Sequence, residues 1–163
     1  ASAQAVDCMQ SQDVDWANGA CLMVRRSLLQ QLGGLDEAFF MYFEGVDLCR
    51  RLRQQGCRVR HLAEAEIIHF IGCSSGRDRE RLQLVWEFSR IRYIEKHFSP
   101  VKRWLMKVWI AGGVGWRLAQ SMLCAPAAQR HRRTQSCLTT IRRLWSGPQS
   151  VEQARAFSSG PQG

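Results

Sequence analysis

The stretch from Gly33 to Arg51, GGLDEAFFMYFEGVDLCRR, decides how the rest of this chain is interpreted. It begins with a double glycine, continues through a block of aromatic residues and holds four carboxylates within nineteen residues. An arginine-rich helical pattern follows. Carboxylates beside apolar and aromatic side chains are typical of binding and catalytic sites. We therefore expect the chemistry of this chain to lie here.

Helical patterns lie on both sides of this stretch. Arg25 to Leu32 predicts a short helix that Gly33 ends, because glycine readily takes the left-handed conformation after a helix C-terminus. A second helix is expected after Gly45, with Gly56 as its end. The apolar face of that second helix consists of Val46, Leu48, Cys49 and Leu52.

Three apolar runs predict strands. Ala20 to Val24 has the pattern of a strand buried on both faces. Two more strands are expected at 58–62 and 66–71, separated by a polar link. Helices and strands that alternate in this way indicate an α/β unit.

The second half of the chain has a different composition. Arg77 to Phe98 predicts an amphipathic helix whose charges form a solvated face, ended by Ser99-Pro100. Residues 100–145 combine tryptophans with basic residues, as interfacial helices do when tryptophan lies at headgroup level and basic residues face anionic lipid. The alternative, that this surface packs on another part of the protein, stays open. The tail, 146–163, is rich in Ser, Gly, Pro and Gln and is predicted to be disordered.

Net charge divides the chain in the same way. Residues 1–76 contain 7 Lys and Arg against 9 Asp and Glu, a net charge of −2, whereas residues 77–163 contain 16 against 5, a net charge of +11. The basic half predicts an anionic partner. We expect a membrane surface and no nucleic acid, because no helix-turn-helix, zinc or RNA-binding signature accompanies the charge. Seven scattered cysteines without a Cys-x-x-Cys pair favour reduced side chains.

The order of these motifs resembles the C-terminal half of a family-two glycosyltransferase of the rhamnosyltransferase-like group. The resemblance covers about Asp15 to Ser75. It is carried by Asp15-Trp16, Gly19 to Arg26, Gly33 to Glu37, Phe39 to Glu44, Val46 to Cys49, Arg51-Leu52, Gly56, Ala65 and His69. It implies the C-terminal portion of a GT-A nucleotide-diphospho-sugar transferase fold, an α/β fold, here followed by amphipathic basic helices.

The resemblance also implies an activity. Such enzymes transfer a sugar from a nucleoside diphosphate to an acceptor hydroxyl, here of a polysaccharide or lipid-linked acceptor, usually with inversion and with magnesium or manganese on the diphosphate. The acceptor needs a carboxylate base and the departing diphosphate needs a cation. Glu44 and Asp47 are the catalytic candidates. His69 is the metal candidate, and Asp15, Trp16, Gly19 and Ala20 are expected to bind substrate.

Two departures from the family pattern matter. Where the family has the second acid of a Glu-Asp pair, its usual base, this chain has Gly45, so Glu44 or Asp47 would have to replace that base. Asp47 has a structural explanation as well, since an acid in the first turn of a helix complements the helix dipole. No front nucleotide-binding half precedes Asp15. The divalent cation is therefore expected only together with an N-terminal half, and the chain is expected to be the back part of a longer protein.

These expectations give a division of the chain. Residues 1–76 are interpreted as a partial GT-A catalytic domain, 77–99 as an amphipathic helix that packs on it, and 100–145 as basic, tryptophan-rich helices peripheral to a membrane. The predicted location is the cytoplasmic side of the cell membrane. The alternative is a catalytically inactive or truncated paralogue that acts as a membrane-associated scaffold, and the isolated chain is expected to be inactive.

Overall fold

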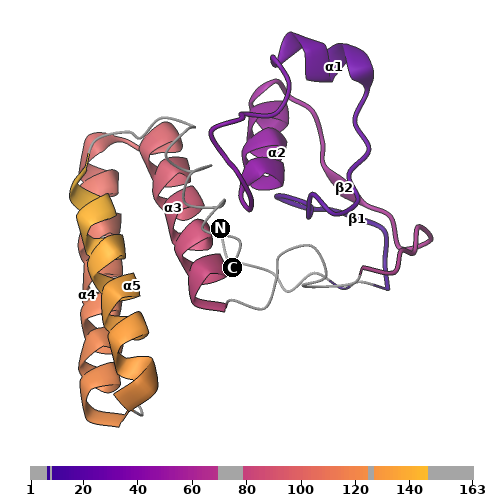
Figure 1. Cartoon of the computed structure of the whole chain (residues 1–163). Helices are drawn as coiled ribbons and strands as arrows, with labels where there is room; N and C mark the ends of the chain where they lie inside the picture. Colours follow the sequence, from indigo (N-terminus) through magenta and orange to yellow (C-terminus); the bar gives the residue numbers. More distant parts are fainter. Residues whose placement is uncertain (1–6, 8, 70–78, 125–126, 147–163) are drawn as a thin grey trace. The chain divides into compact units, whose positions relative to one another are not determined.

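The computed structural model describes residue 7 and residues 9–69, 79–124 and 127–146 (Figure 1). The chain divides into two compact units. The first consists of residues 1–37 and 43–73, and the second of residues 38–42 and 74–163. Part of the aromatic block, Ala38–Tyr42, therefore belongs with the C-terminal helices.

The first unit contains a small antiparallel sheet. Strand β1 (Gln12–Asp13) pairs with strand β2 (Arg60–His61), and Asp13 lies opposite Arg60. One further backbone hydrogen bond, from the Val14 N–H to the Val59 carbonyl at 2.9 Å, continues this pairing. The sheet thus ties the start of the described chain to the segment that follows the second helix.

Two helices complete the first unit, and glycines end both. Helix α1 (Arg26–Gln31) ends at Gly33, which has φ = 73°. Helix α2 (Glu44–Gln54) buries Leu48, Cys49 and Leu52, and Gly56 follows it with φ = 77°. Both helices and their glycine ends confirm the sequence predictions, because glycine takes positive φ without a steric penalty.

The strand predictions were wrong in most of their extent. Residues 22–25 have no regular structure, and Met23 is 98% exposed instead of buried. The second predicted strand shortens to β2, while residues 66–69 form none and residues 70–71 lie outside the described ranges. A strand exists only when a neighbouring strand satisfies its backbone groups. In the part of the chain that the structure describes, β1 and β2 are each other's partners.

The second unit is built from three long helices within its described residues. Figure 1 shows α3 (Arg79–His97), α4 (Pro100–Cys124) and α5 (Ala127–Trp145), with α4 and α5 side by side. Pro100 opens α4, a position that tolerates proline because the first helical N–H has no intrahelical partner. The shared core consists of Ile91, Ile94, Ile110, Val114, Cys137 and Leu144. The predicted disordered tail, apart from Ser146, lies outside the described residues.

Two carboxylates of α3 are paired inside this helical unit. Glu87 is 3% exposed and accepts hydrogen bonds from Arg90 and, at 2.8 Å, from Arg117 of α4. Glu95 accepts from Lys107 at 2.9 Å and from Arg143 at 3.3 Å. The prediction that the charges of α3 form a solvated face is therefore wrong for Glu87. Burial lowers the pKa of Arg90, and the adjacent Glu87 carboxylate opposes that shift.

Replacement of Glu87 by glutamine tests this pairing. The Glu87→Gln variant removes the carboxylate charge that compensates two arginines, and we expect the free energy of unfolding to fall by about 2 kcal/mol. Urea denaturation followed by circular dichroism measures the change. Glu66→Gln, at an exposed position of the first unit, is the matched control and is expected to have no effect. Equal stability of both variants would contradict the structural role of Glu87.

Candidate functional site

The head of α2 is where the signature residues converge. Glu44 is the first residue of the helix, and Phe43 before it has φ = 64°. Tyr42 has φ = 66°, so two successive non-glycine residues adopt the left-handed conformation. This conformation costs about 1–2 kcal/mol for each such residue and persists only where the surroundings fix it. The backbone that leads into Glu44 is therefore strained and well determined.

A glycine contact brings the 17–19 loop onto this helix end. A Cβ atom added to Gly45 would lie 3.0 Å from the backbone nitrogen of Gly19 and 3.2 Å from the carbonyl oxygen of Ala17. A Cβ atom added to Gly19 would lie 3.0 Å from Glu44 Oε1. The two glycines thus permit a close approach of backbone to backbone. Gly45, which interrupts the family pattern, has a packing reason in this chain.

Glu44 has a carboxylate oxygen without a partner. Its Oε2 atom is buried, and no hydrogen-bond donor reaches it among the described residues. Glu44 lies at the N-terminus of α2, where the helix dipole is positive. Buried polar atoms in native proteins are almost always hydrogen-bonded, so an unpaired one calls for an explanation, such as strain, a catalytic role or a bound water. Glu44 Oε2 therefore has unused hydrogen-bonding capacity among the described residues.

Asp47 is held by an arginine of its own helix. It is fully buried, and its Oδ2 accepts a hydrogen bond from Arg51 Nε at 2.8 Å. The other guanidinium nitrogens of Arg51 donate to the carbonyls of Leu32, at 2.9 Å, and Gly34, at 2.8 Å. Asp47 thereby orients the arginine that fastens α2 to the end of α1. This arrangement favours a structural role over a catalytic one.

The predicted substrate-binding residues lie in the exposed loop before α1. Asp15 forms a surface ion pair with Arg53 of α2, and Trp16 is 54% exposed. Ala20 donates its backbone N–H to the Asn18 side chain at 3.1 Å, which closes a turn around Gly19. The structure thus places Gly19 beside Glu44, whereas the side chain of Asp15 is paired with Arg53 at the surface. An exposed indole is suited to stack on a sugar ring.

The described residues do not assemble a metal site. His69 is exposed, and no group of three or more His, Cys, Asp or Glu side chains suited to a metal ion exists among the residues that the structure describes. The candidate cation ligand His69 therefore lacks companions here. No chemical step can be assigned to a metal on these residues.

Helix α3 anchors the part of the aromatic block that belongs to the second unit. Phe39 is 5% exposed and lies beneath the cationic groups of Arg92 and Lys96, at 5.8 and 5.7 Å from its ring centroid. Ser89 Oγ donates a hydrogen bond to the Met41 carbonyl at 2.6 Å. These contacts fix the chain just before the strained residues that precede Glu44.

Comparison with known proteins decides the family. The model of "Glycosyltransferase like family 2" matches residues 2–107, about two thirds of the chain. The chain belongs to this family. Its members share the GT-A fold, so the resemblance that the sequence motifs indicated is confirmed. No solved structure matches the chain.

The curated relatives match a shorter region. An N-acetylglucosaminyl-diphospho-decaprenol L-rhamnosyltransferase of Mycobacterium tuberculosis is 48% identical over 65 residues, which cover 40% of this chain and 21% of that protein. Rhamnosyltransferase WbbL of Escherichia coli K12 is 39% identical over 57 residues, 35% of this chain and 22% of that protein. The low-salt glycan biosynthesis hexosyltransferase Agl10 of Haloferax volcanii is 38% identical over 56 residues, 34% of this chain and 18% of that protein. The matched segment spans about a fifth of these relatives.

Sequence reasoning missed three features of the site. Arg51 was named only as part of the family motif, although its spacing of four residues from Asp47 is the spacing of a helical ion pair. The contact between Gly45 and Gly19 joins residues far apart in the chain and leaves no local signal. The same holds for the hydrogen bond from Ser89 to Met41.

A methyl group at position 45 tests the glycine contact. In Gly45→Ala the new Cβ meets backbone atoms that cannot rotate away, so we expect the 17–19 loop to shift and the free energy of unfolding to fall by about 1–3 kcal/mol. Hydrogen exchange at residues 16–20 and urea denaturation measure both effects. Gly112→Ala is the control, because nothing lies within 4 Å of its Cβ position. That change is expected to stabilise helix α4 by about 0.5–1 kcal/mol. A stable Gly45→Ala variant with unchanged exchange would contradict the close approach.

Removal of one hydroxyl group tests the anchor of the aromatic block. Ser89→Ala leaves the Met41 carbonyl without its donor, and we expect a loss of about 1–3 kcal/mol together with faster hydrogen exchange at residues 39–43. Thr139→Ala is the matched control, since its hydroxyl bonds the Gln135 carbonyl at an exposed position of α5. If exchange at residues 39–43 is the same in both variants, Ser89 does not hold this segment.

Proposed function

We propose that this chain is the C-terminal portion of a GT-A glycosyltransferase that transfers a sugar, with inversion, from a nucleoside-diphosphate sugar to a polysaccharide or lipid-linked acceptor. Membership of family 2 supports sugar transfer as the reaction class. The names of the relatives from Mycobacterium tuberculosis and Escherichia coli support rhamnose as the first sugar to test. The name of the former supports a polyprenyl-diphosphate-linked acceptor. In this proposal the reaction takes place at the cytoplasmic face of the cell membrane.

The observation that carries the proposal is the buried, unpartnered oxygen of Glu44 at the head of α2. As general base, the Glu44 carboxylate takes the proton of the acceptor hydroxyl. The acceptor oxygen then forms a bond to the anomeric carbon from the face opposite the diphosphate. The bond between that carbon and the diphosphate oxygen breaks, and the nucleoside diphosphate leaves with the electron pair. The configuration at the anomeric carbon is thereby inverted.

The 15–20 loop supplies the acceptor side of this proposal. Gly19 brings backbone close to Glu44, and no side chain at that position can block access to the carboxylate. Trp16 offers an apolar ring face for a sugar. A divalent cation, magnesium or manganese, remains a prediction that needs ligands from elsewhere in the protein, because His69 has no companion ligands among the described residues.

A second candidate function rests on Gly45. The family pattern has a carboxylate where this chain has glycine, and the backbone of the 17–19 loop fills the space in which a side chain would begin. Even a small displacement of a catalytic base lowers the rate by orders of magnitude. The alternative is therefore an inactive paralogue that serves as a membrane-associated scaffold.

Variants of the two carboxylates distinguish these roles in the complete gene product. We expect Glu44→Gln to lower kcat by about 10²–10⁴-fold and to leave the stability unchanged, because the amide cannot accept the proton. Asp47→Asn is expected to lower the free energy of unfolding by about 3 kcal/mol, since it leaves Arg51 without its counter-charge. The assay measures release of nucleoside diphosphate from a panel of donor sugars, rhamnose first, with a polyprenyl-diphosphate-linked N-acetylglucosamine acceptor.

Each outcome of this assay bears on the proposal. A Glu44→Gln variant that retains its kcat would overturn the assignment of the base. A wild-type protein that transfers no sugar from any donor, although it is folded, would support the scaffold function instead.

A further inference from the structure

Helix α4 has one face that packs in the helical unit and another that nothing in the described chain covers. The packed face includes Ile110 and Val114, which are 3% and 0% exposed. The opposite face, the outer α4 surface, is formed by large apolar side chains that are each more than two-fifths exposed. Its residues are Val101, Trp104, Leu105, Val108, Trp109, Trp116, Met122 and Leu123.

The charges of α4 lie away from this surface. Lys107 pairs with Glu95, and Arg117 pairs with Glu87, so both cations turn toward the carboxylates of α3. Among the exposed residues of α4 that the structure describes, Lys102 in the first turn is the charged one. This corrects the expectation that basic residues of this helix face the lipid. Pairing with Glu87, which is buried, and Glu95, which is half-buried, holds Arg117 and Lys107 on the inner side, so the outer α4 surface itself carries no charge and Lys102 lies beside it.

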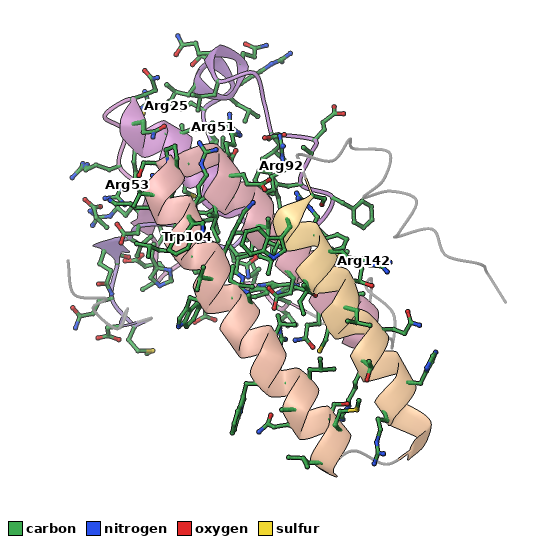
Figure 2. All side chains as sticks on the ribbon, turned by 90° about the vertical axis from the view of Figure 1, so that its left-hand side faces the viewer. Arg25, Arg51, Arg53, Arg92, Trp104 and Arg142 are labelled. Carbon is green, nitrogen blue, oxygen red and sulfur yellow. The ribbon has the colours of Figure 1, made fainter. Side chains whose placement is uncertain are left out.

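The outer α4 surface is long and has a gap between bulky side chains in its middle. A helix of 25 residues extends about 37 Å, since each residue adds 1.5 Å. Gly112 and Gly115 lie between Trp109 and Trp116, and no atom lies within 4 Å of their Cβ positions. The middle of the surface therefore carries no bulky side chain at these two positions, and Trp109 and Trp116 lie on either side of them. Figure 2 shows Trp104, which is 57% exposed, toward the start of α4.

The charge of α4 and α5 identifies the partner. From Pro100 to Trp145 the sequence has nine Lys and Arg and no Asp or Glu. Lys107, Arg117 and Arg143 pair with Glu87 or Glu95 of α3, and the exposed cations of α4 and α5 include Lys102, Arg130, Arg133 and Arg142. A second protein surface would need only apolar complementarity to cover the outer α4 surface, which leaves this one-sided charge unexplained. Anionic phospholipid accounts for both properties, because its acyl region accepts apolar side chains while its headgroups attract cations. Within the described ranges, no helix has the length and hydrophobicity to cross a bilayer.

We propose that the outer α4 surface binds an anionic phospholipid bilayer, with α4 lying in the plane of the membrane and its tryptophans at the boundary between headgroups and acyl chains. Exposed tryptophans favour this boundary, since the ring is apolar and the indole N–H still reaches a polar partner. Lys102 then lies at the end of the inserted helix, beside the headgroups. This inference concerns binding alone and does not depend on the proposed sugar transfer.

Flotation of the whole chain with vesicles tests the proposal. Vesicles of phosphatidylglycerol and phosphatidylcholine are the anionic probe, and vesicles of phosphatidylcholine alone are the neutral one. We expect the wild-type chain to float with anionic vesicles, to bind neutral ones at least about tenfold more weakly, and to lose binding as salt rises. Tryptophan emission should shift to the blue, and lipids brominated near the headgroup should quench it.

Two double variants distinguish the contribution of the outer α4 surface to lipid binding from the contribution of the net charge of the chain. Leu105→Glu with Trp109→Glu places two carboxylates on the outer α4 surface and is expected to lower the vesicle partition coefficient by at least about 100-fold. The matched control, Leu138→Glu with Gln135→Glu, adds the same two carboxylates at exposed positions of α5 and is expected to weaken binding by less than about tenfold. Circular dichroism verifies that both variants fold.

Three results would overturn the proposal. The first is a folded wild-type chain that floats with neither kind of vesicle. The second is equal loss of binding in both double variants, which would show that charge alone holds the chain to lipid. The third is a wild-type dimer, seen by sedimentation velocity, that persists with vesicles and that the Leu105→Glu, Trp109→Glu variant converts to monomers, which would assign the surface to a second copy of the chain.

Discussion

Arg51 joins the two helices of the first unit through hydrogen bonds to Asp47 on its own helix and to two carbonyls at the end of α1. The described part of this unit has a strand pair of only two residues per strand, so no extended sheet holds α1 against α2. The carbonyls of the turn that follows a helix need donors from elsewhere, and a guanidinium can satisfy several at once. The position of α2, and with it the position of Glu44, depends on this arginine.

The ion pair between Arg51 and Asp47 distinguishes Asp47 from Glu44, the carboxylate three residues before it. Asp47 is fully buried and neutralises Arg51, whereas Glu44 has a buried oxygen that no described group reaches. A buried charge that is already paired cannot take up a proton without leaving its partner uncompensated. Glu44 lies at the N-terminal end of the same helix, and its Oε2 has no such partner among the described residues. Local environment thus separates a structural acid from a candidate base.

Buried charge has a different effect in the second unit. Glu87 and Glu95 lie on α3 and take up cations from α4 and α5, which fixes the side of α4 that faces inward. Lys107 and Arg117, the cations of α4 beyond its first turn, both have partners on α3, so the outward side of α4 consists mainly of apolar residues and glycines. The pairs therefore stabilise the helical unit and also produce the uncharged surface proposed to meet lipid.

The sequence by itself determined the family, the helices and their ends. The order of motifs from Asp15 to His69 indicated a family-two glycosyltransferase, and the family match confirmed it. Glycine at positions 33 and 56 predicted the ends of α1 and α2. Glycine adopts positive φ without a steric penalty, and that preference can be read from the residue type alone. Such signals are local and can be interpreted without knowledge of the fold.

The tertiary structure decided what depends on residues distant in the chain. The apolar run from Ala20 to Val24 did not become a strand, since a strand needs a neighbour and the described chain offers it none. The need for glycine at position 45 comes from the backbone of Gly19, which lies against it. Arg117 of α4 faces inward, where it donates a hydrogen bond to Glu87 of α3. Composition and spacing report which side chains are present, but the free energy of a charge or a backbone group depends on what surrounds it after folding.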